Sequence, residues 1–386
     1  MKIIIFTSFY GSGYGLGYSA YKEADEFIKK GHDVTVVFID KEENIQLNKG
    51  IKFIHLPKIN QSVFDIIDYY IKLKKFSAKN NLNNYDIIYI QSLEFGLLNF
   101  SKIRTPIFYF SRSTIKGIYN CYRQYNIKIS FTKKTINMFL AFLEKKLLHY
   151  CYSVFVKSNL MAEELIKFYD IQPKKIVVIH GGIDKEDFNK ISSKTNINDL
   201  KKRYGVDSKK YVLIYAGRII PQKGLIYLIQ SLKLLKKDIN YRLLIAGAAI
   251  DSLYYNLILK FIKENNLDDK IQFVGYINQF EMFKLLNIAS VIILPSLYEP
   301  FGMINIQAAI LDKTIITTES VGSNEILNKY GKIIVVEPAS PSELADGIKK
   351  AISLYNIRGN NNFYNYSWEK VAYKILNSFQ KSLSQV

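Results

Sequence analysis

VIILPSLYEPFGMINIQ, the stretch from Val291 to Gln307, contains in one run the signals of a strand, a loop and a helix. The unbroken apolar run Val291–Pro295 is typical of a strand buried on both faces of a parallel sheet. A short loop with Glu299 follows, and Gly302 precedes an apolar segment with helical spacing. A buried strand that leads through a short loop into a helix is the repeating unit of α/β proteins.

The same loop and the start of the helix after it indicate a binding site for a phosphate. The first backbone N–H groups of a helix have no intrahelical acceptor and carry the positive end of the helix dipole. Gly302, Met303 and Ile304 would therefore present N–H groups to a phosphate. Glu299, just before them, would accept hydrogen bonds from hydroxyl groups on another part of the same ligand. The alternative is an ordinary strand–loop–helix unit with a glutamate near the helix start.

A second loop, within YVLIYAGRIIPQKGL from Tyr211 to Leu225, repeats this arrangement. A strand ends at Gly217, and Arg218 and Lys223 follow before the next helix. Two cations at the carboxyl end of a strand suit a diphosphate, and they would stabilise the negative charge that develops when it leaves. Such residues alone are usually solvated, but two loops of this kind in one half of the chain favour a diphosphate site.

Short apolar runs alternate with helical patterns along the whole chain, which is typical of parallel sheets covered on both faces. The predicted strands are Lys2–Ser8, Val34–Ile39, Ile51–Leu56, Ile87–Ile90, Ile107–Phe110, Val154–Val156, Ile176–Ile179, Tyr211–Ala216, Arg242–Ala246, Ile271–Val274, Val291–Pro295, Thr314–Thr317 and Ile333–Val336. A polar stretch, Asp184–Gly205, separates the two sets. We predict an α/β fold of two doubly wound, Rossmann-like domains that face each other across a cleft.

The predicted domains are 1–183, 184–364 and a C-terminal segment, 365–386. The C-terminal segment contains an amphipathic helical pattern over Trp368–Leu383, which we expect to pack back on the first domain.

A glycine-rich segment, GSGYGLG from Gly11 to Gly17, lies between the first predicted strand and the first predicted helix. Leu16 occupies the place of the third glycine in a G-x-G-x-x-G dinucleotide motif, and no Gly-Lys-Ser/Thr of a P-loop follows. The loop still lets the backbone at Gly11, Ser12 and Gly13 approach a ligand closely. A flexible turn is the alternative.

These loops belong to a longer series of motifs, and their order and spacing matter more than any one of them. The series is Gly31–Val34, Ile179–Phe188, Gly217–Arg218, Lys223–Gly224, Phe273–Gly275, Pro295–Gly302, Val321–Glu325 and Gly331–Ala345. Over nearly the whole chain it resembles the retaining glycosyltransferases of family 4, which have the two-domain GT-B fold. The resemblance implies that domain 1–183 receives the acceptor and domain 184–364 binds a nucleotide sugar.

The resemblance also implies site roles. Arg218 and Lys223 would hold the donor diphosphate, and Glu299 would bind the hydroxyls of the donor sugar, so these three form the catalytic set. The other donor-binding residues would be Gly11, Ser12, Gly13, Gly217, Gly275, Tyr276, Phe301, Gly302, Met303, Ile304 and Gln307.

Three positions depart from the family pattern. Gln307 stands where the family has a second glutamate, eight residues after the first, that binds the nucleotide ribose. Arg112 and Gln91 stand where relatives have histidines on the acceptor or sugar side. The fixed charge of Arg112 excludes it as a general base, so we expect it to bind a phosphate or an anionic sugar.

The function implied by the resemblance is retaining transfer of a hexose from a nucleotide-diphosphate sugar to a glycan or a lipid-linked acceptor. In that scheme the leaving phosphate helps to deprotonate the acceptor, so no protein nucleophile, metal or cofactor is expected. The alternatives are a sugar-nucleotide epimerase or a phosphorylase on the same fold, and a non-catalytic binding protein derived from such an enzyme.

Composition indicates the setting of this function. A chain of 386 residues with 48% hydrophobic content suits two packed domains. Two cysteines, Cys121 and Cys151, form no disulfide framework, which fits a cytoplasmic protein. We expect neither a secretory signal nor a membrane-spanning helix, because no apolar run is long enough.

The net charge of +19 is concentrated in residues 101–157, where Glu144 is the only acid. The basic residues there are Lys102, Arg104, Arg112, Lys116, Arg123, Lys128, Lys133, Lys134, Lys145, Lys146 and Lys157. Together with the apolar run Ile136–Leu143 they predict a basic amphipathic helix that suits an anionic membrane surface, on the inner face of the cell membrane. A solvated basic face is the alternative, and nucleic acid is not an expected partner.

Overall fold

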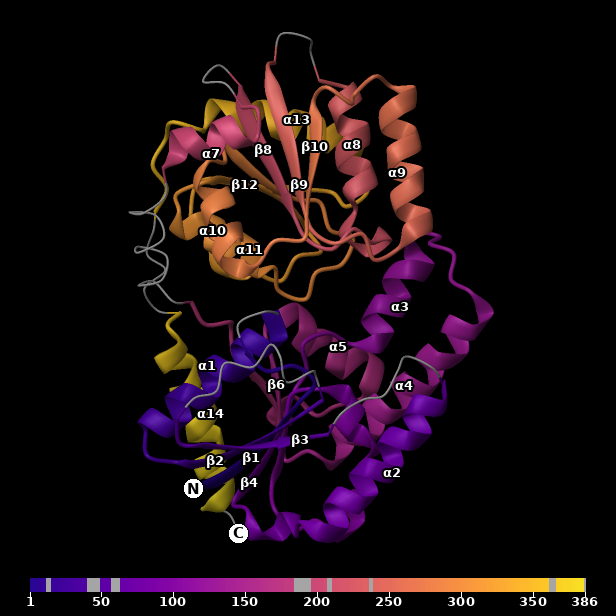
Figure 1. Ribbon diagram of the computed structural model, residues 1–386, viewed down its shortest axis with the longest axis vertical. Coiled ribbons are helices and arrows are strands. Elements are labelled where there is room, and N and C mark those ends of the chain that lie inside the picture. Colours follow the sequence, from indigo (N-terminus) through magenta and orange to yellow (C-terminus); the bar gives the residue numbers. More distant parts are fainter. Residues whose placement is uncertain are drawn as a thin grey trace. The chain divides into compact units, whose positions relative to one another are not determined.

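The chain folds into two compact units, each built on one parallel sheet (Figure 1). The structure is a computed structural model that describes residues 1–11, 15–39, 49–56, 63–183, 196–206, 210–235, 239–360 and 366–384. Unit 1 comprises Met1–Tyr119, Ile129–Ile183 and Tyr366–Val386, and unit 2 comprises Asn120–Lys128 and Asp184–Asn365. The chain passes between the units after Ile183, and Asn120–Lys128, which lies within the predicted first domain, is grouped with unit 2.

The sheet of unit 1 has the strand order β3-β2-β1-β4-β5-β6-β7, and all neighbouring strands are parallel. Its strands are β1 (Lys2–Thr7), β2 (Asp33–Phe38), β3 (Ile51–His55), β4 (Ile87–Ile90), β5 (Ile107–Phe110), β6 (Ser153–Val156) and β7 (Ile176–Val178). Its helices are α1 (Gly15–Lys29), α2 (Val63–Lys79), α3 (Ile115–Gln124, shared with unit 2), α4 (Phe131–Tyr150), α5 (Asn159–Tyr169) and α14 (Trp368–Leu383), with short 3-10 turns η2 (Leu82–Asn84), η3 (Leu93–Leu97), η4 (Phe100–Lys102) and η5 (Pro173–Lys175).

Alternating side chains of β1 supply two separate cores, one on each face of this sheet. Ile4 and Phe6 join a cluster with apolar residues of α2, α4 and α5. Ile3 and Ile5 join a second cluster with residues of α1 and α14, and Figure 1 shows these two helices side by side. Because successive side chains of a strand point to opposite faces, an all-apolar strand such as β1 is stable only when both faces are covered.

Helix α14 packs on the sheet of unit 1, although it follows the whole of unit 2 in the sequence. The backbone N–H of Ile183 donates to the carbonyl of Tyr366 at 2.7 Å, which joins the two chain segments. The indole of Trp368 fills the space beside Gly182, where a Cβ would lie 2.3 Å from Cδ2. The ring of Phe379 is fully buried in the same cluster, with its centroid 4.7 Å from that of Phe108.

The sheet of unit 2 has the order β10-β9-β8-β11-β12-β13, again with all neighbours parallel. Its strands are β8 (Tyr211–Ala216), β9 (Tyr241–Ala246), β10 (Ile271–Gly275), β11 (Val291–Leu294), β12 (Thr314–Thr318) and β13 (Ile333–Val336). Its helices are α7 (Ile197–Arg203), α8 (Leu225–Lys233), α9 (Ser252–Glu264), α10 (Gln279–Asn287), α11 (Met303–Ile310), α12 (Asn324–Leu327) and α13 (Pro341–Ser353), with a 3-10 turn η6 (Pro221–Lys223).

Helices α8, α9 and α13 cover one face of this second sheet in a single apolar cluster. Val291 and Ile293 of β11 point into that cluster. Ile292 and Leu294, also buried, alternate with them and point to the opposite face. Each unit is therefore a doubly wound α/β domain, as the sequence predicts.

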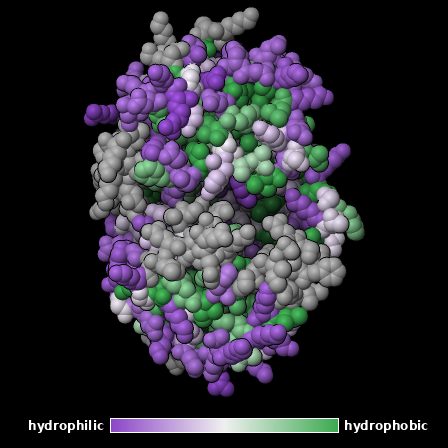
Figure 2. Space-filling model, in the orientation of Figure 1, coloured by the Kyte–Doolittle hydropathy of each residue, from purple (hydrophilic) through white to green (hydrophobic). Residues whose placement is uncertain are grey.

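The predicted strands agree with the observed ones to within one residue at each end. The first helix begins at Gly15, inside the glycine-rich segment, rather than after it as the sequence predicts. None of the helices that the structure describes is both long and apolar enough to cross a bilayer. Hydrophilic residues dominate the outer surface on the face drawn in Figure 2, in keeping with the net charge of +19.

The buried ring of Phe379 provides a test of the α14 packing. We expect Phe379→Ala to lower the free energy of unfolding of unit 1 by about 3–5 kcal/mol, because it leaves a cavity among four aromatic rings. Urea unfolding followed by tryptophan fluorescence measures this directly, since the only tryptophan, Trp368, lies in the same cluster.

The matched control is Phe131→Ala, which truncates the same side chain where it is 83% exposed and should change stability by no more than about 0.5 kcal/mol. Equal losses in the two variants would contradict the packing of α14.

Candidate functional site

The carboxyl ends of β8 and β11 meet at the point where the strand order of unit 2 reverses. The two strands are neighbours, and β9 and β10 lie on one side of them while β12 and β13 lie on the other. In doubly wound sheets ligands bind at such a switch point, outside the carboxyl ends of the strands. Both loops singled out in the sequence, Gly217–Gly224 and Pro295–Gly302, leave the sheet here.

Two hydrogen bonds join these loops. The N–H of Leu297 donates to the carbonyl of Gln222 at 2.9 Å, and the buried Nε2 of Gln222 donates to the carbonyl of Tyr298 at 3.1 Å. Gly224 adopts a left-handed conformation, with φ of 65°, and a Cβ on it would lie 1.9 Å from the carbonyl oxygen of Pro295. Only glycine permits this approach, which brings the two loops into direct contact.

Lys223 and Glu299 form an ion pair across this contact. Their side chains are only 11% and 16% exposed. The backbone of Glu299 is fixed on the other side, because its N–H donates to Ser320 and its carbonyl accepts from Gly322, both at 3.0 Å. The pair places a cation and a hydrogen-bond acceptor side by side at the switch point, in a partly buried position where their charges are weakly screened.

Arg218 is the exposed cation of the same loop. Its guanidinium makes no ion pair with any residue that the structure describes. The backbone beneath it is fixed, because the hydroxyl of Tyr215 donates to the Arg218 carbonyl at 2.9 Å and burial raises the pKa of this tyrosine, which keeps the donor protonated. The N–H of Gly217 donates a hydrogen bond to the carbonyl of Ala246 at 2.9 Å, which fixes the start of the loop against the end of β9.

Helix α11 starts beside the ion pair. Gly302 precedes it with φ of 86°, and a Cβ there would lie 2.9 Å from Cγ1 of Val321 and 3.3 Å from Cγ of Glu299. Met303 and Ile304 are half-buried in its first turn, where N–H groups have no intrahelical acceptor. The phosphate-binding helix start expected from the sequence therefore adjoins Glu299 and Lys223.

The remaining predicted donor residues of unit 2 occupy the same edge of the sheet or the second turn of α11. Phe301 is buried, and its carbonyl accepts from Ser323 at 2.6 Å. Gln307 is half-buried. Gly275 ends β10, and its carbonyl accepts a hydrogen bond from the N–H of Gly247 at 2.8 Å. The next residue, Tyr276, is 59% exposed. Arg218, Lys223, Glu299 and the start of α11 thus lie together, with Gly275 and Tyr276 two strands away from β8.

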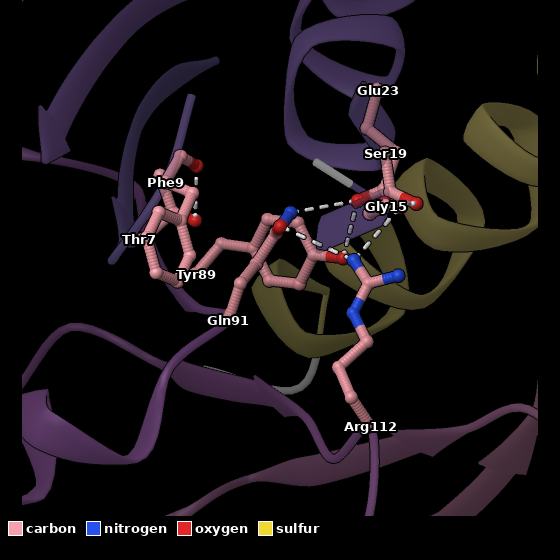
Figure 3. A network of polar contacts seen from close by, with 8 residues as sticks. All are labelled: Thr7, Phe9, Gly15, Ser19, Glu23, Tyr89, Gln91 and Arg112. Atoms are coloured by element: carbon pink, nitrogen blue, oxygen red, sulfur yellow. Dashed lines mark hydrogen bonds and ion pairs between the residues drawn. The ribbon is translucent and has the colours of Figure 1, made fainter. Parts of the chain in front are cut away.

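The acceptor-side predictions, Gln91 and Arg112, lie together in unit 1 with a residue that the sequence analysis missed (Figure 3). That residue is Glu23, fully buried on α1. Its Oε2 accepts from Tyr89 and from Nε2 of Gln91, both at 2.7 Å. Nη2 of Arg112 lies 3.3 Å from its Oε1 and 3.2 Å from Oε1 of Gln91.

In this network the positive charge of Arg112 is paired with the carboxylate of Glu23. Burial raises the pKa of Tyr89 well above its usual range, so its hydroxyl stays a donor to Glu23. The guanidinium also lies over the ring of Phe110, 4.1 Å from its centroid. Binding of an anion by Arg112 stays a prediction, and such an anion would compete with a carboxylate already in place.

Of the glycine-rich segment, the structure describes Gly11 but not Ser12 or Gly13, whose predicted roles lie outside the described residues. Gly11 has φ of 115°, and its N–H donates to the carbonyl of Gly17 at 3.2 Å. This hydrogen bond joins Gly11 to the first turn of α1, and the positive φ of Gly11 is a conformation that suits glycine.

The sequence analysis missed two residues of these sites, and only the first of them carried a signal in the sequence. Glu23 interrupts the apolar stripe Ala20, Ala24 and Phe27 of α1, and a lone acid in such a stripe needs a buried partner. Gln222 is an internal polar residue in a loop, with no pattern to mark it. Within the described ranges, no three His, Cys, Asp or Glu side chains come together as a metal site.

Both halves of the chain match known families. Residues 14–187 match the family described as Glycosyltransferase Family 4, and residues 196–368 match Glycosyl transferases group 1. The chain therefore belongs to the family 4-type glycosyltransferases, and its two Rossmann-like units form the GT-B fold of that class.

Individual relatives are distant. A glycosyltransferase of Methanocaldococcus jannaschii is 26% identical over 246 residues, which cover 60% of this chain and 61% of that protein. CapM of Staphylococcus aureus, a capsular polysaccharide biosynthesis glycosyltransferase, is 25% identical over 59% of each chain. The chain thus spans about three fifths of the length of these relatives. The structure of Anabaena HepE in complex with UDP and glucose has a TM-score of 0.72 at 16% identity, over 98% of this chain and 99% of that one.

The contact at Gly224 generates a prediction for unit 2. Gly224→Ala should lower stability by about 2–3 kcal/mol beyond the cost of its left-handed backbone, because the new Cβ overlaps the Pro295 carbonyl. Gly205→Ala is the matched control, since Gly205 has a similar φ of 61° but no atom within 4 Å of the added Cβ. Thermal unfolding followed by circular dichroism compares the two, and equal losses would show that the loops do not meet as described.

The buried network of unit 1 generates a second prediction. Glu23→Gln keeps the shape of the side chain but leaves Arg112 without its counter-ion, so it should destabilise unit 1 by about 2 kcal/mol, with allowance for the partial exposure of Arg112. Adding Arg112→Met should recover much of this loss. A double-mutant cycle measured by urea unfolding tests the coupling, and simply additive losses would contradict it.

Proposed function

We propose that the protein transfers a hexose from a nucleotide-diphosphate sugar to a hydroxyl of a glycan or a lipid-linked acceptor, with retention of configuration. The observation that carries this proposal is the Lys223–Glu299 pair at the switch point of unit 2, with Arg218 exposed beside it. A donor of this kind needs cations for its diphosphate and a carboxylate for its sugar hydroxyls, and the site offers both next to each other.

Each group in this arrangement has a role in donor binding. Arg218 would bind the diphosphate first, since its charge has no counter-ion among the described residues. Lys223 would join it by turning from Glu299 toward the phosphate. Glu299, freed from part of its ion pair, would accept hydrogen bonds from the sugar, and the N–H groups of Met303 and Ile304 would hold a phosphate oxygen.

The nucleotide would lie toward β10. Gly275 and Tyr276 would border its base, and Gln307 would hydrogen-bond its ribose. The Anabaena protein with a similar fold binds UDP and glucose, which favours a uridine nucleotide as the first donor to test. A neutral amide at Gln307 both donates and accepts, so it suits the ribose hydroxyls without adding charge beside the diphosphate.

The reaction would follow the front-face course. The bond between the anomeric carbon and the diphosphate oxygen breaks, and the acceptor oxygen bonds to the same carbon from the same face. The acceptor proton moves to the departing phosphate oxygen. Arg218 and Lys223 would neutralise the charge that grows on the diphosphate, so this course uses neither a metal nor a cofactor.

The proposal for the acceptor and for the location of the protein rests on one relative and on the charge of residues 101–157. The relative from Staphylococcus aureus is named for capsular polysaccharide biosynthesis, which favours a glycan acceptor. The basic residues between 101 and 157 favour an acceptor held at the cytoplasmic face of a membrane by a lipid. We therefore place the reaction in the cytoplasm, at the membrane surface.

Substitution of Lys223 tests the site. Lys223→Ala should lower turnover of a UDP-hexose about a hundredfold or more, because one of the two cations at the leaving group is lost. Glu299→Ala should have a comparable effect through the sugar. Release of UDP from a UDP-hexose, with and without an acceptor, is the measurement.

Lys260→Ala is the control, because Lys260 also pairs with a glutamate in unit 2, Glu264 at 3.7 Å, but lies on the outer side of α9 with 77% of its side chain exposed. It should keep wild-type turnover. Near-normal activity in both Lys223→Ala and Glu299→Ala would sink the site assignment. Slow epimerisation of the donor without its hydrolysis or transfer would replace the proposed reaction by an epimerase.

A further inference from the structure

Only part of α4 packs against the core of unit 1. Its C-terminal half buries Leu143, Leu147 and Leu148. Its N-terminal half is mostly exposed, although it is a regular helix whose first turn is capped by Ser130, which accepts from the N–H of Lys133 at 3.2 Å. The helix is thus held at one end and presents an unpacked surface at the other.

Large apolar side chains occupy this unpacked surface. Phe131 is 83% exposed, Met138 67% and Phe142 65%. Their spacing of seven and four residues places them in one line along the helix, since a residue advances by about 100° around an α-helix of 3.6 residues per turn. By the same geometry this line lies opposite Leu147, in the middle of the buried side. Exposed apolar groups arranged in a line mark an interaction surface more often than single exposed residues do.

Lysines border the apolar line. Lys134 and Lys145 lie on one side of it and are exposed, and Lys146 lies on the other side. We call these three lysines together with Phe131, Met138 and Phe142 the α4 face. Lysine side chains can extend along an apolar surface and place their charges in the headgroup layer above it.

The one acidic residue of the segment does not reduce the charge of this face. Glu144 is 1% exposed and lies on the buried side of α4. It accepts from the hydroxyl of Tyr169 and from the N–H of Ile115 at 2.9 Å, and burial raises its pKa to about 7. The face therefore presents positive charge and apolar groups without an acid between them.

We propose that the α4 face lies in the headgroup layer of an anionic bilayer, with Phe131, Met138 and Phe142 inserted between lipids. The charge and the apolar line together select this partner. A second copy of the chain would bring lysines against lysines, which opposes a symmetric dimer. A nucleic acid would meet the lysines but leaves the apolar line without a partner. The proposal deepens the proposed function, since a lipid-linked acceptor would give this surface its use.

Flotation with lipid vesicles tests the proposal without any measurement of turnover, so its failure can be told apart from failure of the transferase reaction. The full chain should float with mixed phosphatidylcholine–phosphatidylglycerol vesicles and much less with pure phosphatidylcholine vesicles. Binding should fall as salt is added, because charges attract the protein to the surface.

Two sets of substitutions separate the contributions. Phe131→Ser, Met138→Ser and Phe142→Ser together should weaken vesicle binding about a hundredfold. Lys134→Ala with Lys145→Ala should weaken it about fivefold for each charge removed. Because all five side chains are exposed, both variants should melt at the wild-type temperature.

The control is Leu253→Ser with Leu257→Ser, which removes two exposed leucines, 83% and 54% accessible, from α9 of unit 2. Its vesicle binding should equal that of the wild type. Three results would overturn the proposal: no flotation of the wild type with anionic vesicles, equal flotation of the triple variant, or a dimer or a duplex-DNA complex that depends on the same three apolar residues.

Discussion

The site of unit 2 depends on one contact, the approach of Gly224 to the carbonyl of Pro295. Strand order makes the two loops neighbours, but a side chain at position 224 would hold them apart. Gly224 has no side chain, and the hydrogen bonds of Gln222 then hold the loops together. Lys223 and Glu299 face each other because the residues beside them already touch.

The carboxylates of the Glu23–Arg112 and Lys223–Glu299 ion pairs differ in how many partners they have. Glu23 accepts from Tyr89, Gln91 and Arg112, so most of its hydrogen-bonding capacity is used inside the protein. Glu299 has a single charged partner, Lys223, and the exposed Arg218 lies on the same loop. A ligand can exchange partners with the second pair at small cost, whereas the first pair would lose a complete network.

Local sequence predicted what depends on local chemistry. The strands follow from continuous apolar runs, and the site of unit 2 follows from two strand–loop–helix segments whose polar residues are near each other in sequence. Helix α14 was predictable from its apolar stripe. The partners of Glu23 were not, because they lie 66 to 89 residues away and only the folded sheet brings them together. The start of α1 at Gly15 was missed because glycine is a poor helix former.

The two buried acids Glu23 and Glu144 decide where unit 1 presents positive charge. Arg112 follows β5, and the carboxylate of Glu23 already compensates its charge (Figure 3). Glu144, which would otherwise offset the lysines of α4, is turned inward and held by Tyr169. Both acids thus serve the interior, so the lysines of α4, a helix whose apolar residues also face outward, keep their positive charge. The positive charge of these lysines is a property of one helix surface of unit 1 rather than of the ligand site in unit 2.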